Sequence, residues 1–170
     1  FVILIHQKEF KKTKNGTGHF TNLSLKNCEI HVGINFTEHE AINAIINNPL
    51  NICYTLYPHE SSINLNEEPI GKKKKNTVIF LIDSTWPCSR AILTASPNID
   101  TLQKVSFKHT EVSKFTFKEQ PKDYCLSTME STLCLLKRLN THQIEYIEKT
   151  QLDRFLIPFE KMVEYQLSCV

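Results

Sequence analysis

Short apolar runs separated by polar segments form the main pattern along this chain. The run Thr77-Val-Ile-Phe-Leu-Ile82 is typical of a parallel strand that is buried on both faces. Four further segments are predicted to be strands: 1–6, 28–34, 51–57 and 105–108, the last continued by 124–126.

Apolar residues at helical spacing follow several of these strands. The predicted helices are 38–47, the segment from Pro87 to Ser96, 128–139 and a long final helix at about 142–167. Pro158 is expected to kink the last helix. Two glycines predict a tight turn at Asn15-Gly16-Thr17-Gly18. The alternation of strands and helices predicts an α/β protein with a mostly parallel sheet flanked by helices.

The composition fits one globular domain over residues 1–170, with 41% hydrophobic and 22% charged residues. No apolar stretch approaches the roughly 20 residues of a membrane-spanning helix, so no membrane association is expected. The net charge of +2 is too small to indicate a nucleic-acid binder by itself. Because the chain begins with Phe1 and not with Met, we expect a fragment that lacks an amino-terminal segment.

The six cysteines form no C-x-x-C pair, and the seven histidines have no H-x-x-x-H spacing. We therefore predict no metal site in this chain. Several cysteines stand in apolar runs, where a reduced thiol behaves as a small core residue. With no export signal in view, a reducing, cytoplasmic location is favoured.

Three polar turns fall where predicted strands end: Tyr57-Pro58-His59-Glu60, Asp83-Ser84-Thr85-Trp86 and Leu126-Ser127-Thr128. Ligands of parallel sheets bind outside the carboxyl ends of the strands. The topology can therefore bring the three turns together around one pocket.

Asp83 is the polar residue with two readings. It ends a buried strand and precedes a helix, so it can be a simple amino-terminal cap. Three capping-type residues in a row are more than one helix start requires, and the adjacent Trp86 offers a surface for stacking a base or an adenine ring. A carboxylate at a strand end can also act as a general base.

Four short motifs follow one another along the chain. They are His6-Gln7-Lys8-Glu9 with Asn15–Gly18, Leu56-Tyr57-Pro58 with Glu60, Asp83-Ser84-Thr85-Trp86, and Leu126-Ser127-Thr128-Met129-Glu130. In this order they resemble the motifs of the DTW-domain family, and Asp83–Trp86 matches its D-x-T-W signature. That family comprises tRNA-uridine aminocarboxypropyltransferases related to the SPOUT class of RNA-modifying enzymes. The matches cover most of residues 6–139.

The resemblance implies a reaction and a set of site residues. The 3-amino-3-carboxypropyl group of S-adenosylmethionine would be transferred to N3 of a uridine in tRNA, with release of methylthioadenosine. Asp83 is the first candidate for accepting or orienting the uridine proton, with His6 and Glu9 as reserves. Nine residues are expected to bind the cofactor: Leu56, Tyr57, Pro58, Ser84, Thr85, Trp86, Leu126, Ser127 and Thr128.

Transfer RNA is the partner that the resemblance implies. Lysines gather at 72–75 and around the first motif, and such clusters can neutralise phosphates or can simply be solvated. The cluster around the first motif is favoured because it surrounds His6 and Glu9. The expected RNA contacts are Lys8, Lys11, Lys12, Lys14 and Lys118.

Several alternatives stay open at this level. The SPOUT relationship implies a carboxyl-terminal knot that holds the cofactor, although knots are rare exceptions to normal chain connectivity. Ser127 and Thr128 can bind the cofactor's carboxylate at a helix amino-terminus, or they can only cap that helix. A SPOUT-like RNA methyltransferase and a non-catalytic RNA-binding module are the alternative functions. The sequence does not decide the oligomeric state.

Overall fold

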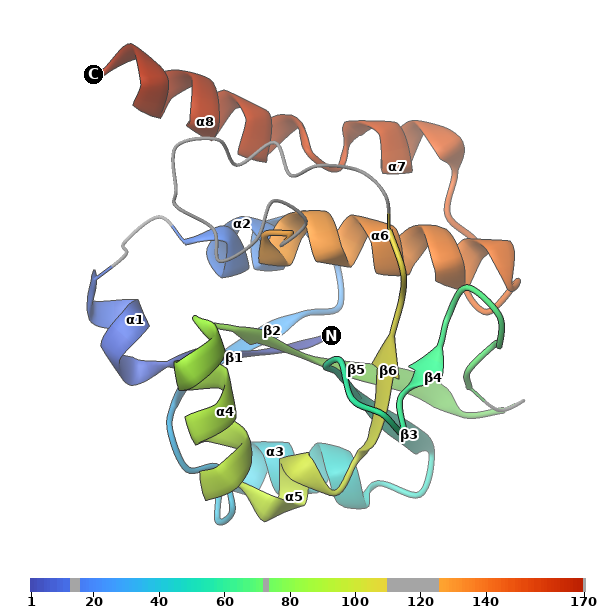
Figure 1. The fold of residues 1–170 in the computed structure, drawn as a ribbon. Helices are drawn as coiled ribbons and strands as arrows, with labels where there is room; N and C mark the ends of the chain where they lie inside the picture. Colours follow the sequence, from blue (N-terminus) through green and yellow to red (C-terminus); the bar gives the residue numbers. More distant parts are fainter. Residues whose placement is uncertain (13–15, 72–73, 110–125, 170) are drawn as a thin grey trace.

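A six-stranded parallel sheet forms the centre of the computed structural model, which describes residues 1–12, 16–71, 74–109 and 126–169 (Figure 1). The strands run parallel in the order β2-β1-β5-β3-β6-β4. Their bounds are β1 Val2–His6, β2 Glu29–Gly33, β3 Asn51–Leu56, β4 Ile63–Asn64, β5 Asn76–Asp83 and β6 Gln103–Ser106. The predicted α/β class is confirmed.

Helices cover both faces of the sheet. Their bounds are α1 Gln7–Lys12, α2 Thr17–Ser24, α3 Glu40–Asn47, α4 Trp86–Ala95, α5 Pro97–Asp100, α6 Thr128–Thr141, α7 Lys149–Arg154 and α8 Ile157–Ser168. One face carries α3, α4 and α5, and the other carries α2 and α6 (Figure 1). The last two helices, α7 and α8, lie outside α6 as a further layer.

The alternation of side chains along β1 separates two cores. Val2 and Leu4 pack on the side of α3 and α4, while Ile3 and Ile5 pack on the side of α6. All four side chains are buried, as expected for a strand with helices on both faces. The polar site therefore has to lie at the end of such a strand rather than along it.

Helix α6 is buried on two sides. Leu135 and Leu139 pack in the core shared with the sheet. Met129, Leu133 and Leu136 pack against α7 and α8. Helix α6 is therefore packed between the sheet and the outer layer of α7 and α8.

The prediction of one long helix at 142–167 is wrong. Gln143 has a φ of 56°, which ends the helical path after α6, and helical structure resumes only at Lys149. Pro158 stands in the first turn of α8 instead of kinking a continuous helix. Proline is favoured there because the first helical amides have no partner within the helix.

The tight turn predicted at 15–18 is also wrong in its described part; Asn15 lies outside the described residues. Gly16 is extended, with φ −73° and ψ 153°, and it precedes α2. Thr17 and Gly18 form the first turn of that helix. The glycine at position 18 is explained by the close approach of the Asp83 side chain. None of the helices in the described ranges combines the length and apolar character that crossing a membrane requires.

Candidate active site

The carboxyl ends of three neighbouring strands form a pocket at one edge of the sheet. Leu56, at the end of β3, is paired in register with Leu81 of β5 and with Val105 of β6. A pocket of about 350 Å³ opens beside these residues. This edge of a parallel sheet is where ligands bind, so the pocket is the candidate site.

The pocket brings together the three polar turns of the sequence. Seven of the nine expected cofactor residues line it: Leu56, Tyr57, Pro58, Ser84, Trp86, Leu126 and Thr128. Thr85 and Ser127 do not line it; the Thr85 hydroxyl donates to the Glu9 carboxylate, and the Ser127 hydroxyl accepts from the Glu130 amide. The pocket walls are therefore mainly apolar and aromatic, with a few hydroxyl groups.

Eight lining residues were not expected as site residues from the sequence: Leu81, Ile82, Ser89, Val105, Ser106, Phe107, His109 and Ser131. Ser131 follows Thr128 by three residues and Ser89 follows Trp86 by three, so helical spacing could have found both. Phe107 and His109 follow β6. Only the observed position of β6 beside β3 brings them to the pocket.

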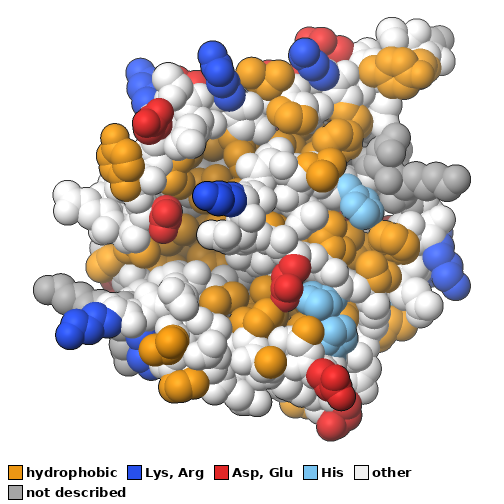
Figure 2. Space-filling model, turned by 180° about the vertical axis from the view of Figure 1, so that it is seen from behind, with side chains coloured by type: hydrophobic (Ala, Val, Ile, Leu, Met, Phe, Trp, Pro, Cys, Tyr) orange, Lys and Arg blue, Asp and Glu red, His pale blue; other side chains and the backbone are white. Residues whose placement is uncertain are grey.

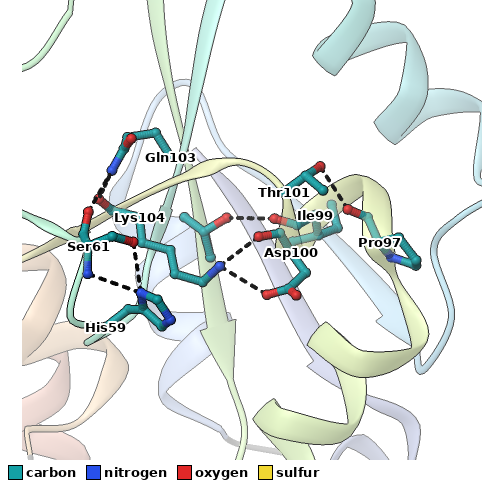
Figure 3. Close-up of polar contacts among 9 residues, drawn as sticks. His59, Ser61, Pro97, Ile99, Asp100, Thr101, Gln103 and Lys104 are labelled. Atoms are coloured by element: carbon teal, nitrogen blue, oxygen red, sulfur yellow. Dashed lines mark hydrogen bonds and ion pairs between the residues drawn. The ribbon is translucent and has the colours of Figure 1, made fainter.

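Two aromatic rings contact each other in the pocket wall. The rings of Tyr57 and Trp86 are 5.9 Å apart at an interplanar angle of 66°, an edge-to-face contact. Trp86 is 42% exposed, which leaves ring surface open to a ligand. The loop beyond Pro58 is held to β6, since Gln103 Nε2 donates to the Ser61 carbonyl at 3.0 Å (Figure 3).

Asp83 lies at the end of β5 and joins three elements. Its Oδ1 accepts from the hydroxyls of Thr17, at 3.3 Å, and Thr128. Its Oδ2 accepts from the Gly18 amide at 3.0 Å. A Cβ at Gly18 would stand 2.4 Å from that oxygen, so only glycine fits beside the carboxylate. None of the three catalytic candidates from the sequence, Asp83, His6 and Glu9, is among the residues that line the pocket.

His6 is buried at the end of β1, beside the same edge. Its backbone amide donates to the Ser84 hydroxyl at 3.0 Å, and its Nδ1 accepts from the Lys8 amide at 3.2 Å. In a neutral imidazole one nitrogen accepts and the other carries the proton. Neutral His6 therefore carries its proton on Nε2.

Glu9 contacts the turn that contains the D-x-T-W residues. Its Oε1 accepts from the Thr85 hydroxyl at 3.3 Å and from the Cys88 thiol at 3.5 Å. Helix α1 is thereby tied to the start of α4, and the first and third sequence motifs lie together.

Ser127 caps α6 in a reciprocal arrangement with Glu130. The Ser127 hydroxyl accepts from the Glu130 amide at 3.3 Å, and the Ser127 amide donates to Glu130 Oε2 at 2.8 Å. This capping box occupies the polar groups of Ser127, which favours the capping role for that residue.

The expected RNA-binding lysines are described in part. Lys8, Lys11 and Lys12 lie on or beside α1 and are exposed, while Lys14 and Lys118 lie outside the described residues. On the back of the molecule, the coloured Lys and Arg side chains are scattered among acidic and apolar ones (Figure 2). Within the described ranges, no three His, Cys, Asp or Glu side chains gather as a metal site would require.

Three curated proteins show how far the similarity to known proteins extends. The chain is 28% identical to the tRNA-uridine aminocarboxypropyltransferase 2 of Drosophila melanogaster, over 98% of this chain and 64% of that protein. It is 25% identical to the proteins of the same name from Macaca fascicularis and Mus musculus, over 83% of this chain and 45% of each. The chain thus spans between about half and two thirds of these relatives. No solved structure matches it significantly.

The family assignment rests on a match over nearly the whole chain. The model of the DTW domain matches residues 1–167, a range that includes all the elements that form the pocket. The motifs that resemble this family in the sequence also meet at one edge of the sheet. The chain therefore belongs to the DTW-domain family.

Proposed function

We propose that the chain transfers the 3-amino-3-carboxypropyl group of S-adenosylmethionine to N3 of a uridine in tRNA, with methylthioadenosine as the co-product. The proposal is carried by the DTW domain over residues 1–167, shared with relatives named tRNA-uridine aminocarboxypropyltransferase 2. The pocket at the carboxyl edge supports it, because its volume of about 350 Å³ falls in the range of small-molecule sites.

The pocket walls fit S-adenosylmethionine in their chemistry. Tyr57, Pro58 and Trp86 offer flat apolar surface for an adenine ring. The hydroxyls of Ser84 and Ser131 can donate to or accept from ribose and amino-acid groups. Bound S-adenosylmethionine supplies an electrophilic carbon next to its sulfonium sulfur. The walls would select the propyl carbon over the methyl by orientation.

Two residues are proposed to act near the uracil. His6 is suited to donate to a uracil carbonyl, since its Nε2 carries the proton in the neutral ring. Among the described residues, Glu9 accepts hydrogen bonds only through Oε1, so its second oxygen is proposed to take the N3 proton. Asp83, the first candidate from the sequence, already accepts three hydrogen bonds and has less free acceptor capacity.

Contact with tRNA is proposed for the lysines of α1. Lys8, Lys11 and Lys12 are exposed and follow directly from β1, whose carboxyl end lies at the edge that holds the pocket. Lysines in this position neutralise phosphates and make affinity depend on salt. Lys14 and Lys118 complete the proposed set from the sequence.

The family resemblance also carries the proposal of a SPOUT-like knot that holds the cofactor. Residues 110–125, which connect β6 to α6, lie outside the described residues. An experimental structure with S-adenosylmethionine bound would test the knot by tracing that connection. A cytoplasmic location is part of the same proposal, and imaging of a fluorescent fusion tests it.

The proposed reaction is tested with purified protein, tRNA that lacks the modification, and S-adenosylmethionine labelled in the carboxypropyl group. We expect label in the tRNA and an equal amount of methylthioadenosine. S-adenosylhomocysteine as the co-product would indicate a methyltransferase instead. Binding of tRNA without either product would indicate a non-catalytic RNA-binding module.

The cellular substrate is tested by mass spectrometry of tRNA nucleosides from cells that lack the protein. Loss of aminocarboxypropyluridine is expected, and the sequence around the lost nucleoside identifies the modified position. An unchanged nucleoside profile would contradict the proposed function.

A further inference from the structure

The Asp83 carboxylate is the point at which the sheet and two helices are joined. Asp83 ends β5, while its partners Thr17 and Gly18 open α2, and Thr128 opens α6. Thr17, Gly18 and Thr128 are 66, 65 and 45 residues away from Asp83 along the chain. Local sequence cannot bring these partners together, so the carboxylate is a tertiary contact and more than a local helix cap.

The surroundings of the carboxylate leave little room for a substrate. A carboxylate offers about four lone-pair positions, and Thr17, Gly18 and Thr128 engage three of them. The backbone of Gly18 closes one side, as the 2.4 Å spacing of a hypothetical Cβ shows. Thr17 and Gly18 are themselves buried.

Asp83 acts on the pocket indirectly, through its hydrogen bond to Thr128. Thr128 lines the pocket, whereas Asp83 does not. Thr128 is the first residue of α6, and its hydroxyl is bound to Asp83 Oδ1. The neighbouring Ser127 is held by its capping box with Glu130, so the Asp83 bond fixes this end of α6 to the sheet.

We propose that Asp83 is a positioning residue: it holds Thr128 and the start of α6 at the pocket wall and does not accept the uridine proton. This inference rests on the proposed function and deepens it, because it gives the D-x-T-W aspartate a role in shaping the donor site. Loss of the tie is expected to weaken donor binding more than turnover.

Steady-state kinetics of Asp83→Asn, Thr128→Val and Thr17→Val test this role. For the first two variants we expect the KM for S-adenosylmethionine to rise about tenfold or more, with a smaller fall in kcat. The pH profile of kcat should keep its shape in Asp83→Asn. Thr17→Val should also raise the KM for S-adenosylmethionine. Thr17→Ser, which keeps the hydroxyl, should have a KM close to that of the wild type. If Asp83 were the general base, its replacement by asparagine would instead lower kcat about 10²- to 10⁴-fold.

A loss of that size in Asp83→Asn with an unchanged KM and a changed pH profile would overturn the inference. So would wild-type kinetics in both Thr128→Val and Thr17→Val, because those variants keep the carboxylate and remove its partners. If Asp83→Asn does not fold, the KM of Thr128→Val and the rescue by Thr17→Ser decide the question.

A thermal unfolding cycle tests the tie without any substrate. Asp83→Asn combined with Thr128→Val should lower the Tm by little more than the larger single change, because both changes act on the same Asp83–Thr128 contact. Thr101→Val is the matched control, since Thr101 follows α5 on the other face of the sheet and its hydroxyl donates to the Pro97 carbonyl of that helix at 2.8 Å. Its Tm change should add to that of Asp83→Asn. Full additivity with Thr128→Val would overturn the tie, whereas absence of any transferase activity in the wild type would overturn the proposed function alone.

Discussion

Gly18 illustrates how strongly one residue can be constrained by a side chain far away in the sequence. Its amide donates to Asp83 Oδ2, and the same oxygen lies where a Cβ would have to stand. The residue is helical and has no positive φ, so conformational freedom does not explain the glycine. Close approach of the carboxylate does.

Gly18→Ala is therefore expected to destabilise the protein, although alanine favours helix by about 1 kcal/mol. The contact with Asp83 should outweigh this gain and leave a net loss of about 1–3 kcal/mol in the free energy of unfolding. Urea denaturation measures the change. Leu23→Ala on the same helix is the control, because Leu23 is 82% exposed. A Gly18→Ala protein as stable as the wild type would contradict the described contact.

Trp86 offers a direct reading of ligand binding, because it is the single tryptophan of the chain and lines the pocket. Titration with S-adenosylmethionine should change its fluorescence in a saturable way, since the ring is 42% exposed before a ligand covers it. Methionine at the same concentrations is the control. Trp86→Phe should keep most of the affinity by calorimetry and lose the signal. If the wild type is active but its fluorescence does not change, S-adenosylmethionine does not bind in the pocket beside Trp86.

Two cysteines are expected to differ in reactivity. Burial raises the pKa of the Cys53 thiol, so less of the reactive thiolate is present at a given pH than for an ordinary thiol. Cys169 is exposed near the end of α8. Alkylation at pH 8, followed by peptide mass spectrometry, should label Cys169 about tenfold faster or more. Equal rates would show that Cys53 is not protected in the folded protein.

At the scale of elements, the apolar runs correctly predicted the main strands, whereas the short helices in the polar segments were not predicted. Residues 77–82 and 51–57 became β5 and β3 because buried parallel strands need continuous apolar sequence. Helices α1 and α2 were not predicted, since their stability comes from contacts with the strand ends and with α6 rather than from local pattern. The two-residue β4 is too short to leave a pattern.

The candidate site was likewise predictable only in part. The turns after β3 and β5 could be placed at one edge because parallel strands end together. The contact of Glu9 with Thr85 and the approach of Gly18 to Asp83 depend on side chains from distant segments. No spacing of residues along the chain predicts these two contacts. The motifs that contain these residues resembled those of the DTW-domain family, but the hydrogen bonds between them are seen only in the structure.

The capping box of α6 gives a prediction at the level of one helix. Ser127→Ala removes the acceptor for the Glu130 amide and should cost about 1 kcal/mol of unfolding free energy. Ser127→Thr keeps the hydroxyl and should cost little. Chemical denaturation of the two variants side by side measures the difference. Equal stabilities would mean that the box does not stabilise α6.

At the scale of the molecule, lysines lie near opposite edges of the sheet. Lys8, Lys11 and Lys12 follow β1 at the edge that carries the pocket. Lys26, Lys74 and Lys75, by contrast, line a separate groove beside the amino end of β5. The two sets carry equal charge, so they can be compared directly.

Replacing Lys8, Lys11 and Lys12 by alanine should weaken tRNA binding and reduce its salt dependence. Each lost phosphate contact lowers the slope of log affinity against log salt by about 0.7–0.9. Affinities measured at several salt concentrations give this slope. The triple alanine variant of Lys26, Lys74 and Lys75 is the matched control and should change the slope less. A larger effect of the control would move the RNA surface to the opposite edge.

The place of β5 in the sheet has a consequence for the synthesis of the protein. β1 and β3 both lie next to β5, and both precede it in the chain. The ribosome therefore releases β1 and β3 before their shared neighbour exists. Apolar strand edges stay unpaired until residues 76–83 emerge, and this interval is when a nascent chain is most exposed to aggregation and to chaperones.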